Sequence, residues 1–379
     1  MKKILLIIFV FFLGILNVSA IEMETSSKAA ILIDQNTGTI LYSKNEHERL
    51  PMASMTKIMS MLLIMEKINE GTLSYDDEII ISEEASSMGG SQVFLQAFQK
   101  YKVKELLKCV AMASANDAVV ALAEKTYGSK EKFIEAMNLK AKSLGLKNTN
   151  FVNVHGLDEE NHFSSAYDMA IMAKELLKYE DILKYTSVYE EYLQKPDGSQ
   201  IWLVNTNKLV RFYAGVDGLK TGYTEGAGYC LTATAERNNL RLISVVMGEE
   251  TIEMRSQDTV KLLNYGFNSY KVNLIKSKND LLGKVKVEKG KEEYVDVVLV
   301  NDAIELLSIN EKISNYQFDL QIKKIIAPVK KGDVVGKVRI LNDKGKLISE
   351  VEITVNTNVE KANVWDMFVK NMRRIVAFN

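Results

Sequence analysis

Residues 54–65 read SMTKIMSMLLIM. From Ile58 to Met65 it is apolar on every face, which predicts a helix buried on all sides. The run is too short to span a membrane. We therefore expect a hydrophobic core around this helix, with the hydroxyl of Ser54 and the amine of Lys57 directly before it.

Strand patterns lie on both sides of a helical region. The strand patterns are at 29–33, 39–42, 216–223, 229–236 and 240–247. The helical patterns are at 103–113, 117–126, 130–143 and 166–178, with Asp117 placed as an N-cap and Gly128 and Gly145 as stops. This order predicts an α/β sandwich, in which an antiparallel sheet completed from distant sequence carries a helical cluster.

The last third of the chain has a different pattern of apolar and polar residues. Beyond about residue 273, short segments alternate apolar and polar residues, which predicts a small all-β domain, interpreted as a spacer or a docking module. The final segment places Trp365, Phe368 and Met372 on one helical face and Arg373 and Arg374 elsewhere. Such a basic amphipathic helix can lie in a membrane interface, although packing onto the β domain would give the same periodicity.

The N-terminus has the pattern of a secretory signal. Lys2 and Lys3 precede thirteen residues, 4–16, that are apolar apart from one glycine, and small residues follow at Ser19 and Ala20. As a membrane anchor this run would rise only about 20 Å against a hydrocarbon core of about 30 Å. We expect cleavage after Ala20 and export.

Composition narrows the class of protein. A chain that is 47% hydrophobic and 26% charged is expected to fold, and 48 basic against 49 acidic residues argue against a nucleic-acid partner. Cys109 lies in a helical pattern and Cys230 in a strand pattern, so both are expected to be small core residues. Sequence alone does not establish a disulfide between them.

A serine and a lysine lie three residues apart at the start of the buried helix. Ser54 and Lys57 would share one helical face, with Ser54 near the positive end of the helix dipole. Lysine can act as a base toward the hydroxyl only if desolvation and a second cation lower its pKa. The alternative is a capping hydroxyl followed by a surface lysine.

Two further motifs follow in the chain, each weak by itself. Ser114-Ala115-Asn116 interrupts the helical pattern and would place a hydroxyl and a carboxamide on a loop, or form an ordinary capped helix junction. Lys220-Thr221-Gly222 lies on a predicted strand, where Gly222 would let a ligand backbone approach and Lys220 would supply positive charge.

Taken together and in this order, the three motifs resemble those of the penicillin-binding protein and serine β-lactamase superfamily. The longer strings PMASMTKIM (51–59), FVNVHGL (151–157) and GVDGLKTGYT (215–224) are similar to one branch, the low-molecular-mass, serine-type D-alanyl-D-alanine carboxypeptidases. The resemblance covers essentially the whole chain. It implies a signal peptide at 1–20, a catalytic transpeptidase-like domain at 21–272, an all-β domain at 273–358 and a membrane-anchoring amphipathic helix at 359–379.

The resemblance also implies a mechanism without cofactor or metal. Ser54 would attack the carbonyl between the two terminal D-alanines of a peptidoglycan stem and form an acyl-enzyme, while Lys57 takes its proton. Ser114 would relay a proton to the leaving amine, and Asn116 would hold the acyl chain or Lys57. The backbone N–H groups of Ser54 and Tyr223 would form the oxyanion hole. Lys220 would help to keep Lys57 neutral and, with Thr221, Thr224 and Arg255, would attract the substrate's terminal carboxylate. Gly222 is also expected to bind substrate, at the point where the ligand backbone approaches.

Partners follow from the same resemblance: stem peptides ending in D-Ala-D-Ala, β-lactam antibiotics as covalent inhibitors, and a membrane surface. One departure is Ala115, where the family usually has glycine, and its methyl could narrow one side of the cleft. The alternatives are a D,D-endopeptidase, which shares all three motifs, and a non-catalytic penicillin-binding scaffold.

Other hydrolases find less support in the sequence. A class A β-lactamase depends on a glutamate-x-x-leucine-asparagine loop, and that string is absent. A Ser-His-Asp hydrolase would be limited to His47, His155 and His162, none of which lies in a nucleophile-elbow context. A metal site could draw only on the polar loop 155–162, whose alternative interpretation is solvated surface.

Overall fold

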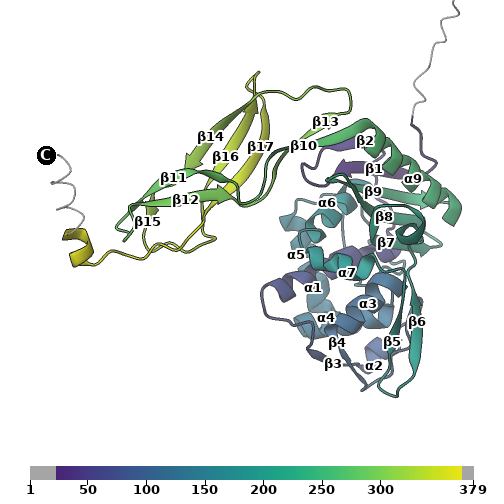
Figure 1. Ribbon diagram of the computed structural model, residues 1–379. Helices are drawn as coiled ribbons and strands as arrows, with labels where there is room; N and C mark the ends of the chain where they lie inside the picture. Colours follow the sequence, from purple (N-terminus) through teal and green to yellow (C-terminus); the bar gives the residue numbers. More distant parts are fainter. Residues whose placement is uncertain (1–22, 369–379) are drawn as a thin grey trace, which may run out of the picture.

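The computed structural model describes residues 23–368 (Figure 1). The predicted signal peptide at 1–20 lies outside the described residues. Of the predicted C-terminal helix, residues 364–368 are helical, and the rest of that prediction also lies outside the described part. Within residues 23–368, no helix combines the length and the apolar character needed to cross a membrane.

The first sheet joins the two ends of the predicted catalytic region. It is five-stranded and antiparallel, in the order β2-β1-β9-β8-β7. Its strands are β1 (Ala29–Asp34), β2 (Ile40–Lys44), β7 (Val216–Thr224), β8 (Gly228–Arg237) and β9 (Leu240–Glu249). All five had been expected within a few residues of these bounds, and the pairing of β1 with β9 is the predicted completion from distant sequence.

Both faces of this sheet are buried, because alternate residues of each strand point to opposite sides. Ile31 and Ile243 join the core that contains α1 (Lys57–Asn69). Leu32 and Leu242 join a second core with α9 (Ile252–Ser269). Helices therefore cover both faces, which confirms the predicted α/β sandwich (Figure 1).

The helical cluster surrounds α1, whose residues 57–65 are all buried as expected. The other helices of this part are α2 (Glu83–Ser86), α3 (Val103–Ala113), α4 (Asn116–Tyr127), α5 (Lys130–Ser143), α6 (Ala166–Leu176), α7 (Leu183–Thr186) and α8 (Leu209–Phe212), with 3-10 turns η1 (Ala53–Thr56) and η2 (Glu180–Ile182). Two small two-stranded antiparallel sheets belong to this part: β3 (Glu78–Ile80) with β4 (Lys100–Lys102), and β5 (Glu190–Gln194) with β6 (Gln200–Val204).

One expected helix cap is wrong. The N-cap of α4 is Ala115, and Asp117 lies inside the first turn. Its buried carboxylate accepts hydrogen bonds from the backbone N–H groups of Val93, Leu95 and Ala118. The carboxylate thus binds the loop that contains Val93 and Leu95. These tertiary hydrogen bonds outweigh the local preference of aspartate for the N-cap position.

The C-terminal part is all-β, as expected, with an apolar core of its own. A six-stranded sheet has the order β14-β16-β17-β12-β11-β15, and β10 pairs with β13. The strands are β10 (Tyr270–Lys276), β11 (Leu281–Glu288), β12 (Tyr294–Leu299), β13 (Ala303–Ser308), β14 (Tyr316–Ile322), β15 (Ile325–Ile326), β16 (Val334–Asn342) and β17 (Leu347–Val355).

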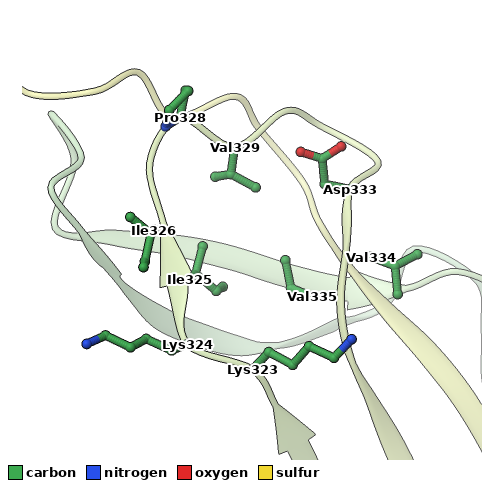
Figure 2. Close-up of a pocket in the computed structure, with 9 residues that line it drawn as sticks. All are labelled: Lys323, Lys324, Ile325, Ile326, Pro328, Val329, Asp333, Val334 and Val335. Atoms are coloured by element: carbon green, nitrogen blue, oxygen red, sulfur yellow. The ribbon is translucent and has the colours of Figure 1, made fainter.

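A pocket opens on this C-terminal sheet between β15 and the start of β16. Figure 2 shows that aliphatic side chains such as Ile325 and Val335 line it, together with Lys323, Lys324 and Asp333. No serine, cysteine or histidine is among its lining residues. The pocket therefore offers no nucleophile of the kind that the sequence motifs place in the first domain.

Candidate active site

The nucleophile candidate lies on the short turn that leads into α1. Ser54 belongs to η1, and the ammonium or amine nitrogen of Lys57 lies 3.0 Å from Ser54 Oγ. Lys57 Nζ also lies 2.7 Å from Asn116 Oδ1 and 2.7 Å from the backbone oxygen of His155. Residues of the first two sequence motifs therefore meet at Lys57 Nζ. The Lys57 side chain is fully buried.

The three oxygen partners of Lys57 Nζ can satisfy either an ammonium or a neutral amine. A neutral amine has two N–H donors and one lone pair, whereas an ammonium has three donors and no acceptor. Asn116 Oδ1 and His155 O can only accept, and Asn116 Nδ2 donates to Gly89 O at 2.7 Å, which fixes the orientation of the amide. When Lys57 is neutral, its two N–H groups serve these two acceptors, and its lone pair is left for the hydroxyl proton of Ser54.

Burial and charge act in the same direction on this amine. Burial first, and then the cation of Lys220, lower the pKa of Lys57 well below its ordinary value of 10.5, and they outweigh the opposing effect of Asp117. Burial and Arg255 lower the pKa of Lys220 to about 7. Desolvation and a second cation, the two effects that a lysine base requires, therefore both act on Lys57.

The second motif forms the corner between α3 and α4. Ser114 is the C-cap of α3 in the left-handed conformation, with φ +61° and ψ 29°. It is 4% exposed, and its Oγ has no hydrogen-bond partner among residues 23–368. No side chain or backbone group of the described residues therefore competes for this hydroxyl, which lies at the corner next to Asn116.

The third motif lies on β7, beside the nucleophile turn. A Cβ at Gly222 would come 2.8 Å from the backbone oxygen of Met52 and 3.1 Å from the Cβ of Ala53. Only glycine lets the strand approach η1 this closely. The sequence predicted a close approach at this position, and the group that approaches is the turn carrying Ser54.

The remaining predicted binding residues lie around the same strand. Lys220 Nζ is buried and donates to Thr221 O at 3.1 Å, and the Thr221 hydroxyl donates to Thr206 Oγ1 at 2.7 Å. Thr224 Oγ1 donates to Asp158 Oδ1 at 2.6 Å. Tyr223, the second predicted oxyanion-hole residue, is half exposed.

Arg255 lies near the start of α9, 5% exposed. Its Nε lacks a partner in the described part of the chain. Because Arg255 is close enough to depress the pKa of Lys220, the two cations form one positive region beside β7. Such a region suits a carboxylate.

The loop 153–162 contributes contacts that sequence reasoning missed. His155 supplies the backbone acceptor for Lys57, and His162 lies 2.7 Å from Thr56 Oγ1. The interpretation of this loop as solvated surface is wrong for both histidines, which are 8% and 5% exposed, and burial lowers the pKa of each to about 4. Among residues 23–368, no cluster of histidine, cysteine or carboxylate side chains could hold a metal ion.

Two expectations about small side chains have clear outcomes. Ala115 is 0% exposed and belongs to the hydrophobic core. Its methyl therefore does not narrow a solvent-filled cleft, contrary to the expectation from the sequence. Cys109 and Cys230 are both buried, as predicted, and both are free thiols.

Comparisons with known proteins agree with this geometry. The family model described as D-alanyl-D-alanine carboxypeptidase matches residues 17–251, and the model for the C-terminal domain of penicillin-binding protein 5 matches residues 270–361. The D-alanyl-D-alanine carboxypeptidase DacF of Bacillus subtilis is 47% identical over 342 residues, which cover 90% of this chain and 88% of the relative. DacC of Escherichia coli is 34% identical over 369 residues, 90% of this chain and 88% of the relative. The crystal structure of penicillin-binding protein 5 from Haemophilus influenzae is 33% identical, with a TM-score of 0.69 over 89% of this chain and 98% of that chain.

Proposed function

Because the chain belongs to the D-alanyl-D-alanine carboxypeptidase family of serine peptidases and has that activity in peptidoglycan metabolism, we propose which of its residues carry out the reaction. The observation that carries the proposal is the buried amine of Lys57, 3.0 Å from Ser54 Oγ and hydrogen-bonded to two acceptors. Ser54 is the nucleophile and Lys57 is its general base.

Acylation begins with the transfer of the Ser54 hydroxyl proton to Lys57 Nζ. The oxygen attacks the carbonyl carbon of the penultimate D-alanine, and the backbone N–H groups of Ser54 and Tyr223 stabilise the oxyanion. Collapse of the tetrahedral intermediate breaks the C–N bond. The leaving amine takes a proton from Lys57 through the unpartnered hydroxyl of Ser114, and the terminal D-alanine departs.

Deacylation repeats the same steps with water. Lys57 Nζ, neutral again, accepts a proton from the attacking water, and collapse returns that proton to Ser54 Oγ. The products are free enzyme and a stem shortened by one residue. Asn116 keeps the amine in place throughout, because its amide is itself held by Gly89.

The positive region beside β7 selects the substrate's free carboxylate. Lys220 and Arg255 supply the charge, with the hydroxyls of Thr221 and Thr224 at the strand end. A bound carboxylate would raise the pKa of Lys220 from about 7 and keep it protonated. Lys220 then serves both the ligand and the depressed pKa of Lys57.

The location of the reaction is also part of the proposal. The signal pattern at 1–20 supports export, and the aromatic and basic residues of 359–379 support attachment to the outer face of the cytoplasmic membrane. Trp365 and Phe368, at the described start of that helix, are exposed. β-Lactams would acylate Ser54 as covalent inhibitors.

A single assay separates the proposal from its alternatives. Incubation with a pentapeptide stem ending in D-Ala-D-Ala is expected to release one D-alanine, seen by mass spectrometry as the loss of one residue. Conversion of cross-linked dimers to monomers, without loss from pentapeptides, would instead identify an endopeptidase. Acylation by a fluorescent penicillin with no turnover of either substrate would identify a scaffold, and rapid hydrolysis of the penicillin a β-lactamase.

A further inference from the structure

We propose that Thr56 and His162 are positioning residues that orient the backbone N–H of Ser54 toward the oxyanion. The inference rests on the proposed function of Ser54. It concerns a chain of hydrogen bonds behind the nucleophile turn: His162 Nε2 lies 2.7 Å from Thr56 Oγ1, which in turn donates to Ala53 O at 2.8 Å.

The direction of this chain follows from the other ring nitrogen. The backbone N–H of Val152 donates to His162 Nδ1 at 3.1 Å, so Nδ1 carries no proton. The neutral ring therefore has its proton on Nε2, which donates to Thr56 Oγ1. The threonine hydroxyl is then free to use its own proton on Ala53 O. The His162 ring thus accepts one hydrogen bond and donates another, and the ring is buried, at 5% exposed.

Ala53 O and Ser54 N–H belong to the same peptide unit. In a trans peptide the carbonyl and the N–H point in opposite directions, so fixing one fixes the other. Ala53–Ser54 is not among the cis bonds of the described chain. Holding Ala53 O against Thr56 thus directs the Ser54 N–H to the opposite side of this peptide, away from Thr56.

The turn needs such a restraint. Ala53 has φ +48°, in the left-handed region that residues with a Cβ seldom adopt. Gly156 packs against the same carbonyl, so closely that a Cβ there would overlap Ala53 O and come 2.8 Å from Thr56 Oγ1. The loop 153–162 therefore restrains the peptide at two points, through His162 by way of Thr56 and through the close packing of Gly156.

Replacing Thr56 by valine removes the hydroxyl at nearly constant volume. We expect the acylation rate constant to fall about 10- to 100-fold, while KM changes little. The loss should be smaller than the loss caused by removing an oxyanion-hole donor completely, because the Ser54 N–H is still present. Thr56→Ser, which keeps the hydroxyl, should recover most of the rate. Thr126→Val, which removes the hydroxyl bonded to Leu122 O in α4, is the matched control and should leave acylation unchanged.

A thionoester substrate distinguishes orientation from general damage, because sulfur is a poor hydrogen-bond acceptor in an oxyanion hole. The T56V loss should appear with the oxygen ester and largely disappear with the thionoester. Equal loss with both substrates, or no loss with either, overturns the proposal. If wild-type protein is not acylated at Ser54 at all, the proposed function fails instead, and the two failures are therefore distinct.

Two substitutions at His162 provide an independent test should T56V fold poorly. His162→Asn can keep the acceptor for Val152 N–H and loses the donor to Thr56, whereas His162→Gln can keep that donor and loses the acceptor. We expect H162N to show the oxygen-ester defect and H162Q to retain the greater part of the rate. The opposite order would contradict the proposed direction of the hydrogen bonds.

Discussion

Replacing Ser54 by alanine is expected to abolish covalent labelling by a fluorescent penicillin and to lower the rate of D-alanine release at least about 10⁴-fold. The side chain is only partly buried, and its oxygen is the atom that forms the acyl bond. Its removal leaves the cores unchanged, so the melting temperature should stay near that of the wild type. Gel fluorescence and D-alanine release measure the two effects.

Ser60→Ala is a suitable comparison for this substitution. Ser60 lies two turns from Ser54, on α1, and its hydroxyl donates to Val154 O at 2.8 Å in the buried core. This variant should still be labelled. Retention of labelling in S54A would place the nucleophile elsewhere and refute the assignment.

Replacing Lys57 by arginine is expected to reduce the acylation rate about 10²- to 10⁴-fold, the usual contribution of a positioned general base. A guanidinium stays protonated at every accessible pH, so it has no lone pair for the serine proton. It also places a permanent charge where Lys57 is fully buried beside Lys220. Stopped-flow acylation by a chromogenic β-lactam measures the loss.

The same helix offers a control for the arginine substitution. Lys67 pairs with Glu70 at 2.7 Å on the accessible end of α1, and Lys67→Arg should leave acylation unchanged. Near-normal acylation by K57R would mean that proton abstraction depends on another group, and the role assigned to Lys57 would be wrong.

The architecture could be predicted because hydrophobic periodicity reports burial directly. Strands buried on both faces and a helix apolar all round leave a clear signal, and β1, β9 and α1 lie where the pattern indicated. Asp117 was misplaced because a local rule cannot foresee that a loop at Val93 and Leu95 requires the same carboxylate. Tertiary demands of this kind leave no local pattern.

Within the site, side-chain identities could be predicted and main-chain partners could not. The three motifs supply Ser54, Lys57 and Asn116, which the fold brings within hydrogen-bond distance. The acceptor at His155 is a backbone oxygen, which any residue could provide, so no residue type marks it. The FVNVHGL string contributes to the family resemblance, but its sequence does not show what the loop contacts. In the structure this loop packs closely against the nucleophile turn, with Gly156 against Ala53.

Direct titration of the Lys57 amine tests whether this group can act as the general base. With lysine labelled at ¹³Cε, K57R identifies the Lys57 resonance by its absence. We expect this resonance to change to the shift of a free amine at a lower pH than the resonances of ordinary lysines, whose pKa is near 10.4. Because burial and Lys220 lower the pKa of Lys57, its proton is lost as the pH rises through that lowered value, and acylation should rise over the same range. A Lys57 resonance that titrates together with the surface lysines would contradict the account.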